Sequence, residues 1–374
     1  MNHPSTPNPI ALALAQAQQA AGRSTPNPAV GCVIVGVDGQ LLGQGHTQPV
    51  GGPHAEIMAM RDAAARGHAL VGATAYVTLE PCSHHGRTGP CCDALIAAGI
   101  GRVVASLADP NPLVAGNGFA RLRAAGIEVE VGSGADEARE LNLGFFSRMV
   151  RKTPWVRMKI AASLDGKTAL PDGTSQWITS APARQDGHAW RARASAVLTG
   201  IGTVLEDDPR LDVRLVDTPR QPHLVIVDSR LQTPPDARLF TGNRAIFIYT
   251  VADDREKTAA LTERGATVIR MAGTAPDTAA KVDLAAMLQD LGRREINELH
   301  VEAGHKLNGS LVREGLVDEF LVYLAPKLIG QGLDMANLGP LAALADAVPL
   351  EFRQVDLLPP DLRILARIPG RDRF

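Results

Sequence analysis

The sequence predicts an α/β protein with two domains. Its 374 residues exceed what one hydrophobic core normally organises, which favours two domains. Short apolar runs rich in β-branched residues alternate with longer helical segments up to about residue 150, and the alternation then starts again. A basic segment that ends in a proline, 142–154, separates the two series. We therefore expect one domain over residues 1–150 and a second over residues 151–374.

The first domain is expected to begin with a helix over residues 10–21. Residues 1–9 contain no Lys or Arg, so this Ala- and Leu-rich segment is typical of an amphipathic helix rather than of a secretory signal. The apolar run 29–35 predicts a buried strand, with 41–45 as its hairpin partner across an Asp-Gly turn. The remaining expected elements are helices over 54–66, 91–98 and 118–125 and strands over 73–79, 101–107 and 127–131. This order predicts a mixed sheet flanked by helices.

The second domain shows the same alternation. We expect strands over 155–162, 196–200, 223–227, 245–249, 266–270, 298–302, 319–324 and 362–368, and helices over 181–194, 284–291 and 307–314. Residues 232–237 and 330–350 are predicted to be loops. No Gly-x-Gly-x-x-Gly follows the first strand of this half, so the standard Rossmann fingerprint is missing.

Composition excludes several classes of partner. A net charge of −2 and an aromatic content of 4% argue against a nucleic-acid-binding surface. No apolar run approaches the roughly 20 residues that a membrane-spanning helix needs. Of the four cysteines, three crowd residues 82–92, which suits metal binding in a reducing compartment better than a disulfide framework. We therefore expect a cytoplasmic protein with no nucleic-acid and no membrane partner.

Four residues predict a catalytic zinc site. His54, Cys82 and Cys91 supply one imidazole and two thiolates, and Glu56 places a carboxylate beside them. Three protein ligands leave one position of a tetrahedral zinc open to water, whose pKa then falls to roughly 7. Zinc-dependent nucleobase deaminases combine such ligands with a Glu that moves protons without binding the metal. The pattern therefore predicts hydrolytic deamination of an aminated heterocycle.

Alternative ligand sets remain open at this point. The two ligand cysteines are separated by eight residues rather than by two, so the loop between them must fold back. Cys92 or His84 as a fourth ligand would close the coordination shell and make the zinc structural, although such a site would not need Glu56. Otherwise His84 and His85 are expected to face substrate or to order the loop. Cys32 is expected to be a small core residue.

The first half of the sequence closely resembles a known family in three strings. These are TPNPAVGCVIV at 25–35, GPHAE at 52–56 and LEPCSHHGRTGPCCDALI at 79–96. They resemble the bifunctional riboflavin-biosynthesis deaminase–reductases, and the HHGRT insertion separates that family from cytidine and tRNA deaminases. The resemblance implies a cytidine-deaminase-like, three-layer α/β/α domain. It also implies one zinc ion per chain on His54, Cys82 and Cys91, with Glu56 as proton carrier and Asn27 in contact with the pyrimidine.

The second half resembles the reductase domain of the same family. Its matching strings are MKIAASLDG at 158–166, SQWITS at 175–180, GTVLEDDP at 202–209 and VEAG at 301–304. The resemblance implies an α/β domain similar to dihydrofolate reductase that uses NADPH. The implied cofactor contacts are Ala161, Trp177, Thr203, Asp207, Ser229, Gly304, His305, Lys306, Leu307, Asn308, Gly309 and Ser310. The implied contacts of the phosphorylated substrate are Ser175, Arg191, Leu211, Arg214 and Glu302.

Other residues of both halves carry weaker expectations. Lys159 and Asp165 are expected to take part as polar groups, and Lys306 to reach the extra phosphate of the cofactor. His188 has no chemical partners near it in the sequence and is expected at the surface. Gly89 stands where the family is expected to have a second proline, a departure that leaves every zinc ligand in place.

The two halves together imply consecutive reactions on one small molecule. The deaminase is expected to hydrolyse the 2-amino group of 2,5-diamino-6-ribosylamino-4(3H)-pyrimidinone 5′-phosphate. The reductase is then expected to reduce the ribosyl group to ribityl with NADPH. A nucleic-acid deaminase would need a basic groove, and a zinc-stabilised scaffold would need a closed metal site; neither is favoured here. Fused domains of this kind also lead us to expect a homo-oligomer, a dimer or a tetramer.

Overall fold

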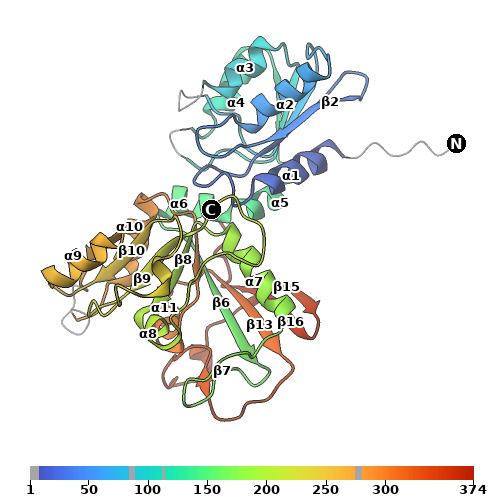
Figure 1. The fold of residues 1–374 in the computed structure, drawn as a ribbon. Helices are drawn as coiled ribbons and strands as arrows, with labels where there is room; N and C mark the ends of the chain where they lie inside the picture. The colour runs from blue at the N-terminus through green and yellow to red at the C-terminus, as the bar shows by residue number, and fades with distance from the viewer. Residues whose placement is uncertain (1–7, 84–88, 112–113, 274–279) are drawn as a thin grey trace. The chain divides into compact units, whose positions relative to one another are not determined.

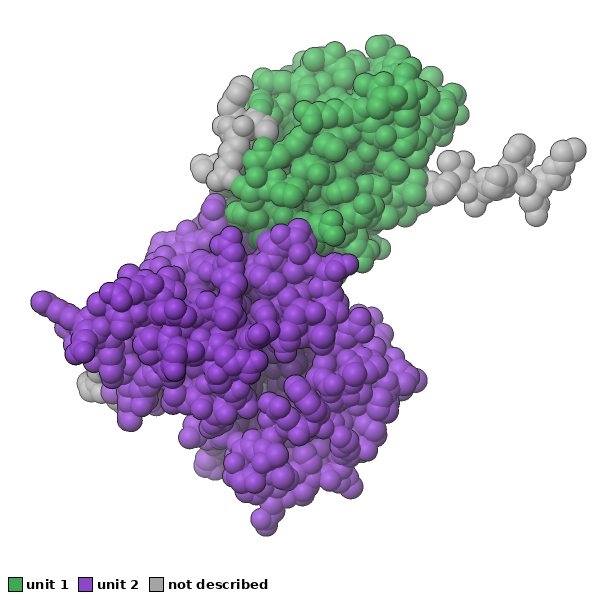
Figure 2. Space-filling view, in the orientation of Figure 1, with its two compact units in different colours: residues 1–151, 374 green, residues 152–373 purple. Residues whose placement is uncertain are grey.

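The computed structural model describes residues 8–83, 89–111, 114–273 and 280–374. The expectations for His84 and His85 fall outside these ranges. The chain divides into two compact units, Met1–Arg151 with Phe374 and Lys152–Arg373, which we call unit 1 and unit 2 (Figure 2). Within the described ranges, no helix combines the length and the apolarity needed to cross a bilayer.

Unit 1 is built on a mixed five-stranded sheet (Figure 1). Its strands are β1 (Gly31–Val35), β2 (Leu41–His46), β3 (Thr74–Val77), β4 (Arg102–Ala105) and β5 (Glu128–Val131). Its helices are α1 (Pro9–Ala20), α2 (Ala55–Ala65), α3 (Cys91–Ala97), α4 (Asn117–Ala124), α5 (Ala135–Leu141) and α6 (Leu143–Arg151). The strand order is β2-β1-β3-β4-β5, in which β1 is antiparallel to both neighbours and β3, β4 and β5 are parallel.

Helices cover both faces of this sheet, because successive strand side chains point to opposite sides. Cys32 of β1 packs into the core formed with α2, α3 and α4, whereas its neighbour Val33 packs against Ile10 of α1. Glycines allow the close approach of helix and strand: a Cβ added to Gly43 would lie 2.2 Å from the carbonyl oxygen of Ala59 in α2. The result is the mixed sheet flanked by helices that the alternation of elements predicts, in the three-layer α/β/α form that the resemblance implies.

Unit 2 is built on a nine-stranded sheet. Its strands are β6 (Trp155–Ser163), β8 (Ala196–Gly200), β9 (His223–Val227), β10 (Ile246–Thr250), β11 (Ala266–Arg270), β12 (Glu298–Val301), β13 (Glu319–Ala325), β15 (Glu351–Leu358) and β16 (Asp361–Arg367). A separate two-stranded sheet joins β7 (Lys167–Ala169) and β14 (Leu333–Asp334). The large sheet has the order β11-β10-β9-β8-β12-β6-β13-β16-β15, parallel from β11 to β13 and antiparallel beyond.

The helices of unit 2 pack on both faces of the large sheet. They are α7 (Ala181–Arg193), α8 (Ile201–Asp207), α9 (Arg255–Glu263), α10 (Leu284–Arg293) and α11 (His305–Arg313), with short 3-10 turns η1 (Arg238–Phe240) and η2 (Leu344–Asp346). One apolar core joins α10 and α11 to alternate residues of the central strands. Two smaller cores on the other residues of the strands involve α8 and α9 at one end of the sheet and α7 at the other.

A buried layer of charges lies between α7 and the sheet. Arg157 of β6 pairs with Glu298 of β12 at 2.8 Å and with Glu319 of β13 at 2.5 Å. Arg367 of β16 pairs with the same Glu319 at 2.7 Å. The Trp190 ring of α7 covers this layer, 4.5 Å from the guanidinium carbon of Arg157. These ion pairs connect four strands beneath one helix.

Several elements differ from the sequence-based expectations. The sequence predicts no helix within 142–154, yet α6 occupies most of that segment. The helices α5, α8 and α9 and the strand β15 have no counterpart among the expected elements. The helix expected over 307–314 begins earlier, at the first residue of α11. The loop predicted over 330–350 holds only the two residues of β14 and the three of η2.

Candidate active sites

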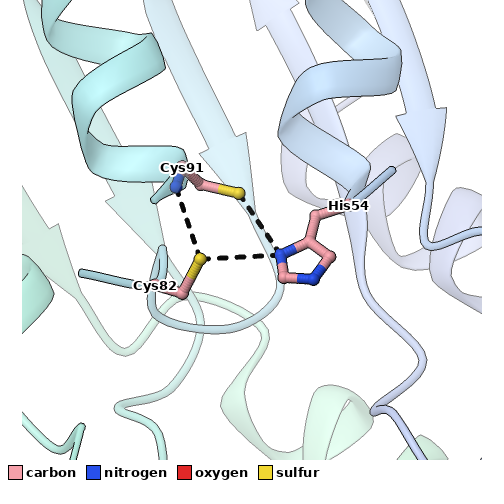
Figure 3. Close-up of side chains that lie close together, drawn as sticks. All are labelled: His54, Cys82 and Cys91. Carbon is pink, nitrogen blue, oxygen red and sulfur yellow. Dashed lines mark hydrogen bonds between the residues drawn. The ribbon is translucent and has the colours of Figure 1, made fainter. Parts of the chain in front are cut away.

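The zinc ligands are brought together by two helix starts and one loop. His54 is the N-cap of α2, Cys91 is the first residue of α3, and Cys82 follows β3 at a distance of five residues. Figure 3 shows both sulfur atoms directed at the same ring nitrogen of His54. Sequence positions up to 37 residues apart therefore converge on one point.

The geometry of these three side chains fits zinc. The Nδ1 atom of His54 lies 3.6 Å from the Cys82 sulfur and 3.4 Å from the Cys91 sulfur. Zn–S bonds of about 2.3 Å and Zn–N bonds of about 2.0 Å at a tetrahedral angle place sulfur and nitrogen about 3.5 Å apart. All three ligand atoms lie within 4.8 Å of one another. Two sulfurs and an imidazole are also a donor set that zinc prefers.

Hydrogen bonding between the two thiols prepares them for a metal. Bonds from the thiol and the backbone N–H of Cys91 lower the pKa of Cys82 to about 4. The same pairing raises the pKa of Cys91, whose proton the pair shares. The lowered pKa of Cys82 favours the thiolate, which is the form of cysteine that binds zinc.

Glu56 lies in the first turn of α2, two residues after the ligand His54. Its side chain is 3% exposed, and burial raises its pKa to about 6, with a further contribution from the charge of Cys82. A carboxyl group with a pKa near neutrality both accepts and donates protons readily. The group is therefore chemically suited to proton transfer beside the metal ligands.

Cys92 does not face the metal ligands. Its sulfur donates to the carbonyl oxygen of Pro81 at 3.1 Å and lies 3.5 Å from that of Gly118, and burial raises its pKa to about 12. Cys32 is fully buried in β1, as expected for a core residue. Asn27 is half-buried in the turn before β1, where its backbone N–H donates to the carbonyl oxygen of Ser24.

A buried carboxylate that the sequence analysis missed supports this site. Glu80, two residues before Cys82, accepts hydrogen bonds from the backbone N–H groups of Asp109 (3.1 Å), Gly116 (2.9 Å) and Gly118 (2.8 Å). It thereby ties the loop before α4 to the segment that carries Cys82. These three N–H groups lie 29 to 38 residues further along the chain, so no local sequence pattern predicts the contacts.

Unit 2 contains a cavity of about 940 Å³ at the carboxyl ends of its parallel strands. Lys159 and Ala161 of β6, Glu302 after β12, Thr203 after β8 and Ser229 after β9 all line it. The strands β8 and β12 are neighbours, but the chain leaves them in opposite directions across the sheet: β8 is followed by β9 on one side, and β12 by β13 on the other. Open α/β sheets bind ligands at such a topological switch point.

The cavity collects most of the residues that the resemblance implies. Among its lining residues are the five expected substrate contacts Ser175, Arg191, Leu211, Arg214 and Glu302. So are ten of the expected cofactor contacts: Ala161, Trp177, Thr203, Asp207, Ser229, Gly304, His305, Lys306, Leu307 and Asn308. Gly309 and Ser310 lie one turn further along α11 and do not line the cavity; a Cβ added to Gly309 would lie 2.0 Å from the carbonyl oxygen of Asn337.

A charged cluster marks the end of the cavity at β6 and β12. Arg191 of α7 pairs with Glu302 through two hydrogen bonds of 2.7 and 2.9 Å, and Lys159 lies 3.8 Å from the same carboxylate. Burial raises the pKa of Glu302, but the charges of Arg191 and Lys159 outweigh it and hold the pKa below its ordinary value. The guanidinium of Arg214 lies 2.6 Å from Asp212 and is about half exposed.

His188 is buried, so its expected surface position is wrong. Its side chain is 5% exposed, and Nδ1 accepts the backbone N–H of Arg214 at 3.2 Å. Burial, together with the charges of Arg191 and Arg214, lowers its pKa to about 4, so the ring is neutral and Nδ1 is free to accept. His188 therefore holds the loop that carries Arg214. Asp165, in contrast, accepts the backbone N–H groups of 329 and 330 and does not line the cavity.

The cavity also suits a dinucleotide phosphate. Both α8 and α11 begin at the cavity with a glycine N-cap, Gly200 and Gly304, and neither N-cap has a side-chain hydrogen bond. Among the described residues, no side chain accepts the first N–H groups of α11, and a helix start of this kind attracts phosphate. The volume is within the range of pockets that bind cofactors.

Comparison with known proteins identifies the same two kinds of domain. Residues 8–107 match the zinc-binding region of cytidine and deoxycytidylate deaminases, and residues 154–362 match the RibD C-terminal domain. The riboflavin biosynthesis protein RibD of Escherichia coli is 45% identical, covering 94% of this chain and 96% of the relative. That of Aquifex aeolicus is 42% identical, with 96% and 97% covered.

Solved structures give the same result. RibD of Acinetobacter baumannii (form 1) has a TM-score of 0.86 at 39% identity, covering 96% of this chain and 97% of that one. A deaminase/reductase of Thermotoga maritima has a TM-score of 0.83 at 33% identity, with the same coverage. The expected fold class is confirmed, a cytidine-deaminase-like domain followed by a dihydrofolate-reductase-like one. The chain thus belongs to the RibD family of riboflavin-biosynthesis enzymes, which join a zinc-binding deaminase domain to a reductase domain that uses NADPH.

Proposed function

We propose that this chain acts on two successive phosphorylated pyrimidines in the cytoplasm. Unit 1 removes the 2-amino group of 2,5-diamino-6-ribosylamino-4(3H)-pyrimidinone 5′-phosphate by hydrolysis. Unit 2 reduces the ribosyl group of the product to ribityl. The Thermotoga relative bears the names of both activities, a diaminohydroxyphosphoribosylaminopyrimidine deaminase and a 5-amino-6-(5-phosphoribosylamino)uracil reductase. The free thiolates that the metal site needs fit a reducing compartment.

The convergence of His54, Cys82 and Cys91 beside a buried Glu56 carries the first half of this proposal. Zinc held by three such ligands lowers the pKa of a coordinated water and so supplies a nucleophile at neutral pH. Glu56 would accept one proton from that water and pass it to the ring nitrogen next to the attacked carbon. It would then take the proton of the newly added hydroxyl group, as this group becomes the carbonyl, and pass it to the departing amine. Asn27 is proposed to hold the pyrimidine.

The Glu56→Gln variant tests this assignment. Glutamine keeps the shape of the side chain but cannot carry a proton, so ammonia release should fall by about 100-fold or more. Zinc content, measured by plasma mass spectrometry, should stay at the wild-type level, and wild-type protein should release ammonia without NADPH. Near wild-type ammonia release by Glu56→Gln would show that another group carries the proton.

The cavity of unit 2 carries the second half. NADPH supplies the hydride when bound. We propose that Ala161, Trp177, Thr203, Asp207, Ser229 and the start of α11 hold it. Arg191 fixes the orientation of Glu302 through its two hydrogen bonds, and Lys159 and Glu302 present a cation and a carboxylate to the sugar at the β6–β12 end. Ser175, Leu211 and Arg214 are proposed to enclose the substrate, with Arg214 on its phosphate.

Arg214→Ala tests the substrate end of the cavity. A charge-assisted hydrogen bond to phosphate contributes about 1.5–3 kcal/mol, so the KM of the reductase reaction should rise about 10- to 100-fold. Ammonia release in unit 1 should not change. The matched control is Arg270→Ala, which removes an exposed arginine whose partner is Asp253. A reductase KM that is equal in Arg214→Ala and Arg270→Ala would contradict the assignment.

The far edge of the large sheet supports a homo-oligomer. β15 ends the strand order, so one of its edges pairs with no other described strand. A bulge between Phe352 and Gln354 places Phe352, Val355 and Leu357 opposite residues 366, 364 and 362 of β16, on one face of the sheet. Phe352 and Leu357 are 71% and 79% exposed. We propose that a second copy of the chain covers this edge, because an apolar, unpaired edge strand otherwise promotes aggregation.

A further inference from the structure

The order of the parallel strands in unit 2 sets the order of the residues that line the cavity from one end to the other. The neighbouring strands β6, β12, β8 and β9 each contribute residues at their carboxyl ends. The charged group of Lys159 and Glu302 belongs to β6 and β12, and Ser229 and Arg230 follow β9. A dinucleotide that places its nicotinamide beside β6 therefore extends its adenosine toward β9. This placement rests on the proposed reductase function.

The residues after β9 occupy the place where doubly wound sheets read the adenosine ribose. An acidic residue there hydrogen-bonds the free 2′-hydroxyl of NAD, whereas an arginine accommodates the 2′-phosphate of NADP. The acid of this chain, Asp228, is turned into the protein: it is 0% exposed, and Oδ2 accepts the N–H and the O–H of Thr233, both at 2.7 Å. It does not line the cavity.

Arg230, two residues later, has the opposite environment. It is exposed, it lines the cavity, and its guanidinium makes no ion pair or hydrogen bond with any residue in the described part of the chain. Two other residues that line the cavity hold each other in place: the backbone N–H of Arg238 donates to the carboxylate of Asp208 at 2.8 Å. A planar guanidinium with free N–H groups binds a phosphate monoester through two parallel hydrogen bonds.

We propose that Arg230 binds the 2′-phosphate of NADPH and is the residue that makes this reductase prefer NADPH to NADH. Turning Asp228 inward removes the negative charge that would repel that phosphate. Lys306 lies elsewhere, in the first turn of α11 after β12. From there it would meet the middle of the dinucleotide, the pyrophosphate that NADPH and NADH share, and would not discriminate between them.

Equilibrium binding to full-length, zinc-loaded protein separates these two cations. Dissociation constants for NADPH and NADH are measured by calorimetry, with 2′,5′-ADP and 5′-ADP as fragments that differ only in the 2′-phosphate. Arg230→Ala should weaken NADPH and 2′,5′-ADP binding by about 10- to 100-fold and change NADH and 5′-ADP binding by less than about twofold. Arg230→Lys should retain part of the preference, since it keeps the charge without the fork.

Two control variants complete the experiment. Lys306→Ala should weaken NADPH and NADH binding by the same factor, and Arg255→Ala, an exposed arginine at the start of α9, should change neither. An unchanged NADPH/NADH ratio in Arg230→Ala, or a loss confined to NADPH in Lys306→Ala, would overturn the inference. Wild-type protein that binds neither nucleotide would instead refute the proposed reductase function.

Discussion

At the residue scale, the zinc site depends on which of two adjacent cysteines can reach the metal. Cys91 and Cys92 are consecutive residues of α3, so their side chains point about 100° apart around the helix axis. The Cys91 sulfur lies 3.4 Å from the Nδ1 atom of His54, whereas that of Cys92 is engaged by the carbonyl oxygen of Pro81. The described residues therefore offer three protein ligands, and Cys92 is not one of them.

Cysteine-to-alanine variants test this choice. Cys92→Ala should keep about one zinc ion per chain after dialysis and should retain deaminase activity, at a stability cost of about 1 kcal/mol for the lost buried hydrogen bond. Cys91→Ala removes a ligand and should lose both zinc and ammonia release. Metal analysis by plasma mass spectrometry gives the readout. Equal zinc loss in the two variants would mean that Cys92 also coordinates.

The same scale shows which site residues a sequence can reveal. His54, Glu56, Cys82 and Cys91 stand in short, chemically distinctive patterns, so their residue types alone predict a metal site. Glu80 and His188 stand in no such pattern, because the hydrogen-bond partner that gives each its role is a backbone N–H group far along the chain. These groups lie 38 residues from Glu80 and 26 residues from His188. A carboxylate or imidazole whose partners are backbone groups leaves no side-chain signal in the sequence. Such residues become visible only when the fold brings the partners together.

At the element scale, hydrophobic patterning predicts the central strands well and the periphery poorly. The strands β6, β8, β9 and β10 are short runs of β-branched and apolar residues bounded by polar turns, which is a strong strand signal. β15 lacks it because the bulge after Phe352 breaks the period of two, leaving three apolar residues on one face at uneven spacing. The helix α6 is missed for another reason: its basic residues lie in the last turn, where they favour a helix terminus but resemble a linker.

The ion pairs beneath α7 predict how unit 2 responds to acid. Burial raises the pKa of Glu298, but the charges of Arg193 and Arg157 outweigh it and lower the pKa from 4.5 to about 2. A lowered folded-state pKa contributes stability that is fully present above about pH 4.5 and is lost as the pH falls toward about 2. The neighbouring Glu319 has a lowered pKa for the same reason and adds to the effect.

Glu298→Gln should therefore reduce the free energy of unfolding at pH 7 by an amount on the order of 2–3 kcal/mol and should flatten its decline between about pH 4.5 and pH 2. Urea titrations followed by tryptophan fluorescence measure this effect selectively, because all three tryptophans of the chain lie in unit 2. The control is Glu263→Gln at the exposed end of α9. If the free energy of unfolding fell with the same slope between about pH 4.5 and pH 2 in Glu298→Gln and in the wild type, these ion pairs would not set the acid stability.

At the scale of the whole molecule, the described residues of each candidate site belong to one unit. The zinc ligands and Glu56 lie in unit 1, and every residue that lines the large cavity lies in unit 2. The length of the chain indicates two cores but does not show that the two domains have different chemistries. That difference is indicated by the sequence strings at residues 79–96 and 301–304, which resemble a deaminase and a reductase. What neither composition nor strings predict is how an exposed apolar edge such as β15 is covered, since that depends on surfaces outside the chain.

The proposed pairing of two β15 edges makes a prediction about molecular mass. A two-fold axis would set the strands antiparallel and place Phe352, Val355 and Leu357 of the two copies side by side on one face of a continuous sheet. Stable association needs an interface above about 1,000 Å². Sedimentation velocity should give a dimer or a larger multiple for the wild type at micromolar concentration. Leu357→Asp should shift it toward the monomer with zinc content unchanged, because the added charge would lie beside the apolar side chains of the partner strand. Val37→Asp changes an equally exposed apolar residue, 87% exposed in the β1–β2 hairpin, and should leave the mass unchanged. A wild-type monomer, or a Leu357→Asp protein of wild-type mass, would mean that this edge is not the interface.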